Sequence, residues 1–335
     1  MNKKRGRIAF TYKMIACIII LIGIFIAGCV FGAAETTIKD VWLTFTSDVK
    51  NEQITMLREI RLPREVAAVL VGSALAVAGA IMQGLTRNPL ADPGLLGLTA
   101  GANAALAIAV AFIPGASYMG TMVACFIGAA VGSIIVFGIG SVKGGRFSPL
   151  RIVLAGAAVS AFLYAVAEGV SLYFKTSKDV SMWTSGGMIG TTWTQIKFMA
   201  PVVVIGILLA LLLSKQLTIL SLSEEVAVGL GQKIGLIKAL LFIVIILLAG
   251  AAVSLVGNMV FIGLMVPHIV RTIVGTDYRF ILPISAVVGA AFLVLADLIG
   301  RTISAPYETP VTAVVTVIGL PFFLFIVRKG GGKYL

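Results

Sequence analysis

Two long apolar runs of this sequence are separated by the stretch Asn88-Pro89-Leu90-Ala91-Asp92-Pro93-Gly94-Leu95-Leu96-Gly97. Each proline lacks a backbone N–H and disfavours helix at the residue before it, so no regular helix continues through this stretch. Irregular backbone at membrane depth persists only where protein buries it or where it borders a watery cavity. The stretch is either a plain connecting turn or a functional break, and the rest of the chain decides between them.

The composition predicts an integral membrane protein. The chain has 335 residues, of which 59% are hydrophobic and 12% are charged, whereas about 25% of the residues of a soluble domain are charged. The formal net charge is +12, which in a soluble protein would suggest a nucleic-acid partner. In a membrane protein the cytoplasmic connections collect Lys and Arg. We therefore expect a lipid bilayer, and no nucleic acid, as the surroundings of this chain.

About ten stretches are long and apolar enough to be membrane spans by the rule that a span needs about 20 residues. They lie near 14–33, 66–84, 95–113, 120–141, 151–173, 198–214, 236–257, 259–275, 281–299 and 311–327. The separation of the 236–257 and 259–275 stretches rests on Gly257-Asn258 alone. A single long helix over 236–275 would move the C-terminus to the other side of the membrane.

The distribution of basic residues predicts the orientation. With the N-terminus in the cytoplasm, 17 of the 26 Lys and Arg residues lie in cytoplasmic connections or ends. Because Lys and Arg favour the cytoplasmic side, this bias predicts that both termini are cytoplasmic. The other nine are Lys39, Lys50, Arg58, Arg61, Arg64, Lys175, Lys178, Lys197 and Arg301. Several of these belong to a polar outer loop, predicted at about 34–65.

The N-terminus allows a second interpretation. Basic residues followed by an apolar run that ends in Gly28-Cys29 resemble a lipoprotein signal, with Cys29 as the lipidated residue. We favour a first membrane span, since many further spans follow. Cys17, Cys29 and Cys125 all lie in apolar runs without metal-ligand spacing, so we expect packing residues.

Polar residues within or between the spans are candidates for function. Glu168 lies within the 151–173 stretch. An ionisable group there faces a cavity or a partner, or reaches interfacial water if it is near the end of the span. Ser160, earlier in the same stretch, is a second candidate for the transport path. Residues 176–195 predict a short outer helix or an aromatic anchor. His268, the single histidine, has no partners for a metal site and is interpreted as a packing residue.

The connection at about 216–233 predicts a short amphipathic helix between spans. Ser221 and Glu224 have the spacing of a capping box, two glutamates suit the positive end of a helix, and Gly231 can end it. An ordinary helix lying on the membrane would have the same pattern. The sequence lacks a G-x-x-x-x-G-K-[ST] phosphate loop, and one histidine cannot supply a Ser-His-Asp set. We expect no catalysis, no cofactor and no metal site.

Four stretches together resemble the permease subunit of type II ABC importers, the family of the ferric-siderophore, haem and vitamin B12 permeases. They occur in the family's order and cover nearly the whole chain. They are Arg61-Leu62-Pro63-Arg64; Asn88 to Gly97; Glu224-Glu225-Val226-Ala227 with Leu230-Gly231; and Phe261-Ile262-Gly263-Leu264 with Pro267-His268. The continuation Leu95 to Ala102 is most similar to the ferric-siderophore members.

The resemblance implies an all-α permease in which residues 1–335 form one transmembrane domain of ten spans. It implies a dimer with a second permease (a copy or a paralogue), two cytoplasmic ATP-binding cassette subunits that hydrolyse ATP, and an extracytoplasmic substrate-binding protein. It places Asn88 and Leu90 at the cytoplasmic gate. It places Arg61, Arg64 and Arg301 in a pocket for acidic residues of the binding protein. The ATPase would contact Glu224, Glu225, Ala227, Gly229, Leu230 and Gly231.

The resemblance predicts import of an iron–siderophore complex across the cell membrane, with haem or vitamin B12 as alternatives. Two other classes of function compete. A secondary transporter driven by an ion gradient should carry several intramembrane acids, and Glu168 alone qualifies clearly, with Asp297 at a span end. A membrane-anchored structural protein or lipoprotein would have no use for the break at Asn88–Gly97.

Overall fold

The computed structural model describes residues 2–32, 36–47, 51–113, 115, 117–141, 149–185, 187–305 and 307–328, and this part of the chain is built of helices. The predicted cytoplasmic residues Lys143, Arg146, Lys329 and Lys333, and the outer Lys50, lie outside it. The helices are α1 (Asn2–Val30), α2 (Ile38–Thr46), α3 (Glu52–Met56), the π-helical turn η1 (Leu57–Arg61), α4 (Leu62–Thr86), the 3₁₀ turn η2 (Pro93–Leu96), α5 (Leu98–Phe112), α6 (Tyr118–Ser141), α7 (Pro149–Tyr173), α8 (Ser177–Thr184), α9 (Trp193–Leu212), α10 (Ser214–Leu222), α11 (Glu224–Gly229), α12 (Ile234–Val256), α13 (Ile262–Val274), α14 (Tyr278–Thr302) and α15 (Val311–Arg328).

Each predicted apolar stretch coincides with a helix. Within the described ranges, seven helical segments are long and apolar enough to cross a membrane: those of α1, α6, α7, α9, α12, α14 and the continuous segment Glu52–Thr86 that contains α4. Helices α5, α13 and α15 are apolar but shorter. The 13 residues of α13 reach about 20 Å, against a hydrocarbon core of about 30 Å. The chain is thus an all-helical, multi-pass membrane protein, and its number of crossings depends on these three helices.

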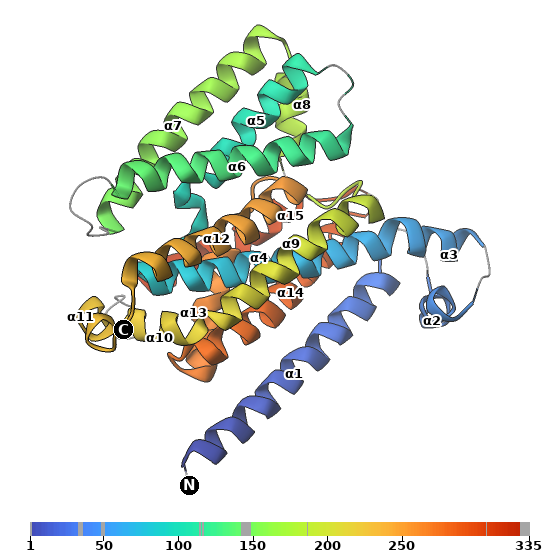
Figure 1. The fold of residues 1–335 in the computed structure, drawn as a ribbon. Helices are drawn as coiled ribbons and strands as arrows, with labels where there is room; N and C mark the ends of the chain where they lie inside the picture. The colour runs from blue at the N-terminus through green and yellow to red at the C-terminus, as the bar shows by residue number, and fades with distance from the viewer. Residues whose placement is uncertain are drawn as a thin grey trace.

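Helix α4 forms the centre of the molecule (Figure 1), and 83% of its most apolar window is buried. Small residues allow its neighbours to approach closely. A methyl group at Gly72 would overlap the backbone of Gly289 in α14, and one at Gly79 would overlap that of Gly263 in α13. Helices α5, α6, α7 and α8 form a separate layer on one side, whereas α1 lies at the opposite edge with most of its surface exposed.

The helix that contains α4 begins earlier than predicted. We expected the second span to begin near residue 66, after a polar loop, but residues 52–86 form one continuous helical segment. Pro63 has no N–H to donate, so a helix that continues upstream of it needs an altered turn, and the π-helical turn Leu57–Arg61 lies there. The charged run Arg58–Glu65 is therefore helical, and short helices also occupy much of the preceding connection.

Helices α12 and α13 are separate, which excludes a single helix over 236–275. Gly257 has φ of 74° and ends α12, and Phe261, with φ of 68°, precedes α13. Few residues other than glycine adopt this left-handed region. The predicted break at Gly257-Asn258 is confirmed.

Candidate functional site

The stretch from Asn88 to Gly97 is a closely hydrogen-bonded turn between α4 and α5. Arg87 is left-handed (φ 52°) and ends α4. Asn88 Oδ1 accepts the N–H of Leu90 at 3.0 Å, and Asp92 Oδ1 accepts the N–H of Gly94 at 2.7 Å. Burial raises the pKa of Asp92 above its ordinary value, although the Gly94 N–H opposes the shift. The prediction that no regular helix runs through this stretch is confirmed.

Neighbouring helices cover the second half of this turn. Ser133 Oγ of α6 donates to Leu96 O at 3.1 Å. Gly156 of α7 lies so close to Leu95 that a methyl group there would overlap the Leu95 carbonyl oxygen. The irregular backbone therefore packs against protein at Leu95 and Leu96, although the Leu95 residue itself is partly exposed. Asn88 is also exposed and Leu90 is half-buried, so parts of both halves of the turn lie at the surface.

The predicted helix after the sixth apolar stretch is present as α10 and α11, but its cap differs from the prediction. Ser223, not Ser221, is the N-cap of α11, and its Oγ accepts the N–H of Val226 at 3.1 Å. Ser221 Oγ instead donates to Thr218 O within α10. The capping-box spacing failed because α10 continues to Leu222, so Ser221 is still inside a helix.

Helix α11 presents an apolar surface outside the candidate spans. Val226, Val228 and Leu230 are exposed, whereas Ala227 is fully buried and holds α11 against the bundle. Glu225 and Gly229 are exposed beside them, and a side chain added at Gly229 would meet open space. Gly231 has φ of 75°, which suits its predicted role at the end of the helix.

Glu224 links α11 to the turn that follows α4. Lys238 Nζ of α12 donates to Glu224 Oε1 at 2.7 Å, and Arg87 Nη2 lies 3.7 Å from the same oxygen. Arg87 directly precedes Asn88. The structure thus brings the predicted gate and the predicted ATPase-contacting helix together at one end of the bundle, which we name the α11 end.

The three predicted docking arginines lie at the opposite end, in a largely buried charged group that we name the arginine cluster. Arg64 donates to both carboxylate oxygens of Asp297, at 2.9–3.1 Å, and to those of Glu308, at 2.9 and 3.0 Å. Arg301 Nε lies 3.0 Å from Asp297 Oδ2, and its Nη2 pairs with Glu65. The cluster comprises Arg61, Arg64, Glu65, Asp297, Arg301 and Glu308.

Burial of this cluster differs from the expected open pocket. Arg61, Arg64 and Arg301 are 5%, 9% and 5% exposed. Arg61 Nη1 donates to Cys29 O and to Thr36 Oγ1, both at 2.7 Å. Asp297 and Arg301, four residues apart on α14, form a buried ion pair. All three arginines are thus engaged within the chain, and their docking role stays a prediction.

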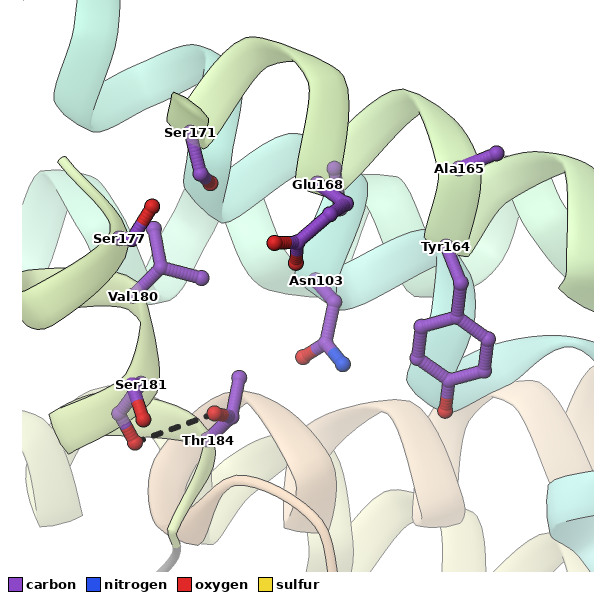
Figure 2. A pocket seen from close by; sticks show the side chains of 10 residues that line it. Asn103, Tyr164, Ala165, Glu168, Ser171, Ser177, Val180, Ser181 and Thr184 are labelled. Carbon is purple, nitrogen blue, oxygen red and sulfur yellow. Dashed lines mark hydrogen bonds between the residues drawn. The ribbon is translucent and has the colours of Figure 1, made fainter. Parts of the chain in front are cut away.

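Glu168 lies on α7 beside a cavity of about 500 Å³ between α5, α7 and α8. Asn103 of α5 and Ser181 of α8 also line it (Figure 2). Ser160 is two turns earlier on α7, about 12 Å along the helix. Cys29 and Cys125 are buried, and His268 packs edge-on against Phe322, as expected of packing residues.

Three of these features could not be read from the sequence. Glu65 and Glu308 carry no motif that marks them as partners of arginines, although Glu65 adjoins Arg64. Asn103 occurs in a run of small residues, Ala100 to Ala105, whose only signal is one polar side chain. The role of each residue depends on its contacts with helices that are distant in the sequence.

The sequence matches the model of the FecCD transport family over residues 19–329. It is 42% identical to the iron(3+)-hydroxamate import permease FhuB of Bacillus subtilis, over 89% of this chain and 78% of that protein. It is 40% identical to the Fe(3+)-citrate import permease YfmD of the same organism, over 98% and 97%. It is 36% identical to the hemin transport permease HmuU of Yersinia pestis, over 97% of both chains.

The fold is also similar to solved structures. A metal-chelate type ABC transporter in an inward-facing conformation matches with a TM-score of 0.84 and 25% identity, over 95% of this chain and 99% of that one. PsaBC from Streptococcus pneumoniae matches with a TM-score of 0.56 and 19% identity, over 79% and 89%. The second likeness is one of fold alone.

Proposed function

The chain belongs to the FecCD transport family, and from this premise we propose that it is the permease subunit of an ATP-driven importer of iron–siderophore complexes. Iron–hydroxamate and iron–citrate permeases are among its relatives at 40% identity or more. The transported chelate is substrate and not a resident cofactor. The hemin permease at 36% identity supports haem as the second candidate.

The observation that carries this proposal is the juxtaposition at the α11 end. An energy-coupling partner needs a surface to bind and a connection to the transport path. The exposed apolar residues Val226, Val228 and Leu230 provide the surface. Glu224 provides the connection, because it contacts both Lys238 and Arg87, next to Asn88 and Leu90. An ion-driven carrier would need neither.

We further propose the assembly and orientation that follow. Residues 1–335 form one transmembrane domain that crosses the membrane ten times, with both termini and α11 in the cytoplasm. A second permease, identical or paralogous, completes the path, two cytoplasmic ATPase subunits bind at α11, and an extracytoplasmic binding protein delivers substrate at the arginine end. ATP is hydrolysed on the ATPase subunits.

Purification of the tagged chain from its native membrane tests this proposal. We expect an ATPase subunit to co-purify and the reconstituted complex to import radioactive ferric siderophore when ATP and binding protein are supplied. Uptake of haem and of cyanocobalamin, measured in parallel, tests the two alternative substrates. Uptake that depends on an ion gradient and not on ATP would refute the proposal.

A further inference from the structure

The cavity between α5, α7 and α8 is lined by apolar side chains and by polar side chains that can accept hydrogen bonds. Figure 2 shows the Glu168 carboxylate pointing toward Asn103, with Ser171 on the same helix and Ser181 and Thr184 on α8 around the same space. Tyr164 adds an aromatic ring at one side. A volume of about 500 Å³ lies within the usual range of small-molecule sites, about 300–1,000 Å³.

Two buried polar atoms of this lining have no hydrogen-bond partner among the residues that the structure describes. They are Asn103 Oδ1 and Ser171 Oγ, on residues that are 7% and 2% exposed. Buried polar groups are nearly always paired, and an unpaired one is costly. An amide oxygen can only accept a hydrogen bond, and a serine hydroxyl can accept one as well as donate one, so a ligand that brings N–H or O–H groups would satisfy both atoms.

The charge of the lining is negative. Among the described residues that line the cavity, Glu168 is the one carboxylic acid, and no Lys or Arg accompanies it. The lining positions on α8 are 177, 180, 181 and 184, which share one face of a helix. Lys178 and Asp179 are therefore on another face, and both are exposed. An anion in the cavity would meet a carboxylate without a compensating cation.

We propose that this cavity is a substrate subsite that selects iron chelates without net negative charge and with N–H, O–H or ammonium donors. Three hydroxamate groups, each with one negative charge, neutralise Fe³⁺, so a tris-hydroxamate chelate is neutral, or cationic if it carries an ammonium group. A tris-catecholate chelate keeps three negative charges. The cavity favours the first class. This inference rests on the proposed function and narrows its substrate class.

Binding is measured on the purified complex by quenching of tryptophan fluorescence, since Trp183 of α8 lies next to the lining residue Thr184. Loss of the quenching in the Trp183→Phe variant would show that the fluorescence signal comes from Trp183. The probes are a ferric tris-hydroxamate that carries one ammonium group, the same chelate with that group acetylated, and a ferric tris-catecholate. We expect the ammonium chelate to bind tightest and the trianion at least about tenfold more weakly, which is 1.4 kcal/mol.

Glu168→Gln should abolish most of the preference for the ammonium chelate over its acetylated form. Asp179→Asn is the matched control, because it removes an acid at the same end of the molecule that faces away from the cavity. Thermal melts confirm that both variants remain folded. If the two variants have the same effect, or if Glu168→Gln leaves the preference intact, the cavity is not the selective site.

ATP-driven uptake of the same three chelates separates this inference from the proposed function. Uptake that favours the ammonium or neutral chelate supports both. Efficient uptake of the trianion would overturn the subsite while the permease function stands. If haem is imported and none of the three chelates is, the proposed substrate class and the subsite both fail.

Discussion

The arginine cluster is a set of charges that is neutralised within the chain. Asp297 is fully buried and lies between Arg64 and Arg301, and Glu65, also fully buried, pairs with Arg301. A buried ion pair contributes little relative to an apolar replacement, but the removal of one partner leaves an uncompensated charge. The first consequence of changing these arginines should therefore be loss of stability.

Arg64→Ala tests this expectation. Because Asp297 and Glu308 would lose their shared partner, we expect a loss of about 3–5 kcal/mol in stability, measured by thermal or denaturant unfolding in detergent. Arg279→Ala is the control, since Arg279 pairs with Asp277 at an exposed position and should cost about 0–1 kcal/mol. If Arg64→Ala leaves stability unchanged and weakens only binding-protein affinity, the arginine is a docking residue.

The charged partners illustrate what the sequence can specify. A spacing of four residues on one helix is enough to identify Asp297 and Arg301 as neighbours from the amino-acid sequence alone. The contacts of Arg64 with Asp297 and Glu308 join residues 233 and 244 positions apart, and no local periodicity encodes such a pair. The burial of these arginines was also missed, because charged residues near a proline are typical of an exposed loop.

Leu90 tests the gate. Its backbone N–H is held by Asn88 Oδ1, so the shape of the turn depends on Asn88 and the width of any constriction depends on the Leu90 side chain. We expect Leu90→Ala to allow substrate leak from proteoliposomes without ATP. Leu95→Ala, at the other end of the same turn, is the comparison. Equal leak from the two variants and the unmutated protein would show that Leu90 does not gate the path.

Helix α7 depends on close contact with the turn after α4. Gly156 leaves no room for a methyl group beside Leu95 O, whereas Gly169 on the same helix has open space. We expect Gly156→Ala to lower stability by about 1–3 kcal/mol through overpacking. Gly169→Ala should be neutral or stabilising by up to about 1 kcal/mol, since alanine favours helix. The unfolding curve of Gly156→Ala should therefore shift to lower stability, whereas that of Gly169→Ala should not. Equal curves would refute the contact between Gly156 and Leu95.

Helix α11 should bind the ATPase through its exposed apolar side chains. Gly229→Trp adds bulk at a position that no described residue obstructs, so the permease should fold normally while recovery of the ATPase falls sharply in a pull-down. Gly23→Trp is the control, because Gly23 of α1 has equally open surroundings in the part of the molecule far from α11. Undiminished recovery with Gly229→Trp would mean that α11 is only a connecting helix.

The positions of the helices could be predicted from the lengths of the apolar stretches, but the residues at which the helices begin and end could not be predicted as well. Each apolar stretch became a helix because backbone polar groups in lipid must be paired within the segment. The start of the helical segment that contains α4 was missed, since residues 52–61 (α3 and η1) form helix outside the apolar run, which hydropathy does not detect. The shortness of α5 and α13 follows from the breaks at Gly97 and at Gly257–Phe261.

The whole molecule has two ends of different composition, and the distribution of charge predicts which side of the membrane each end occupies. Single-cysteine variants at Lys39 and Lys233 can test this in intact cells, as both positions are exposed. The native cysteines interfere little, because Cys29 and Cys125 are buried and Cys17 lies within α1; a Cys17→Ser background removes the remaining one that is accessible.

An impermeant maleimide should label Lys39→Cys in intact cells, and Lys233→Cys only after the cells are lysed. The physical reason is the preference of Lys and Arg for the cytoplasmic side, which predicts that α11 lies inside, where ATP is present, and the arginine cluster outside, where a binding protein would deliver substrate. The reverse pattern would put the apolar face of α11 on the side without ATP. The proposed coupling through Glu224 would then have no energy source, so this single measurement tests both the orientation and the mechanism that depends on it.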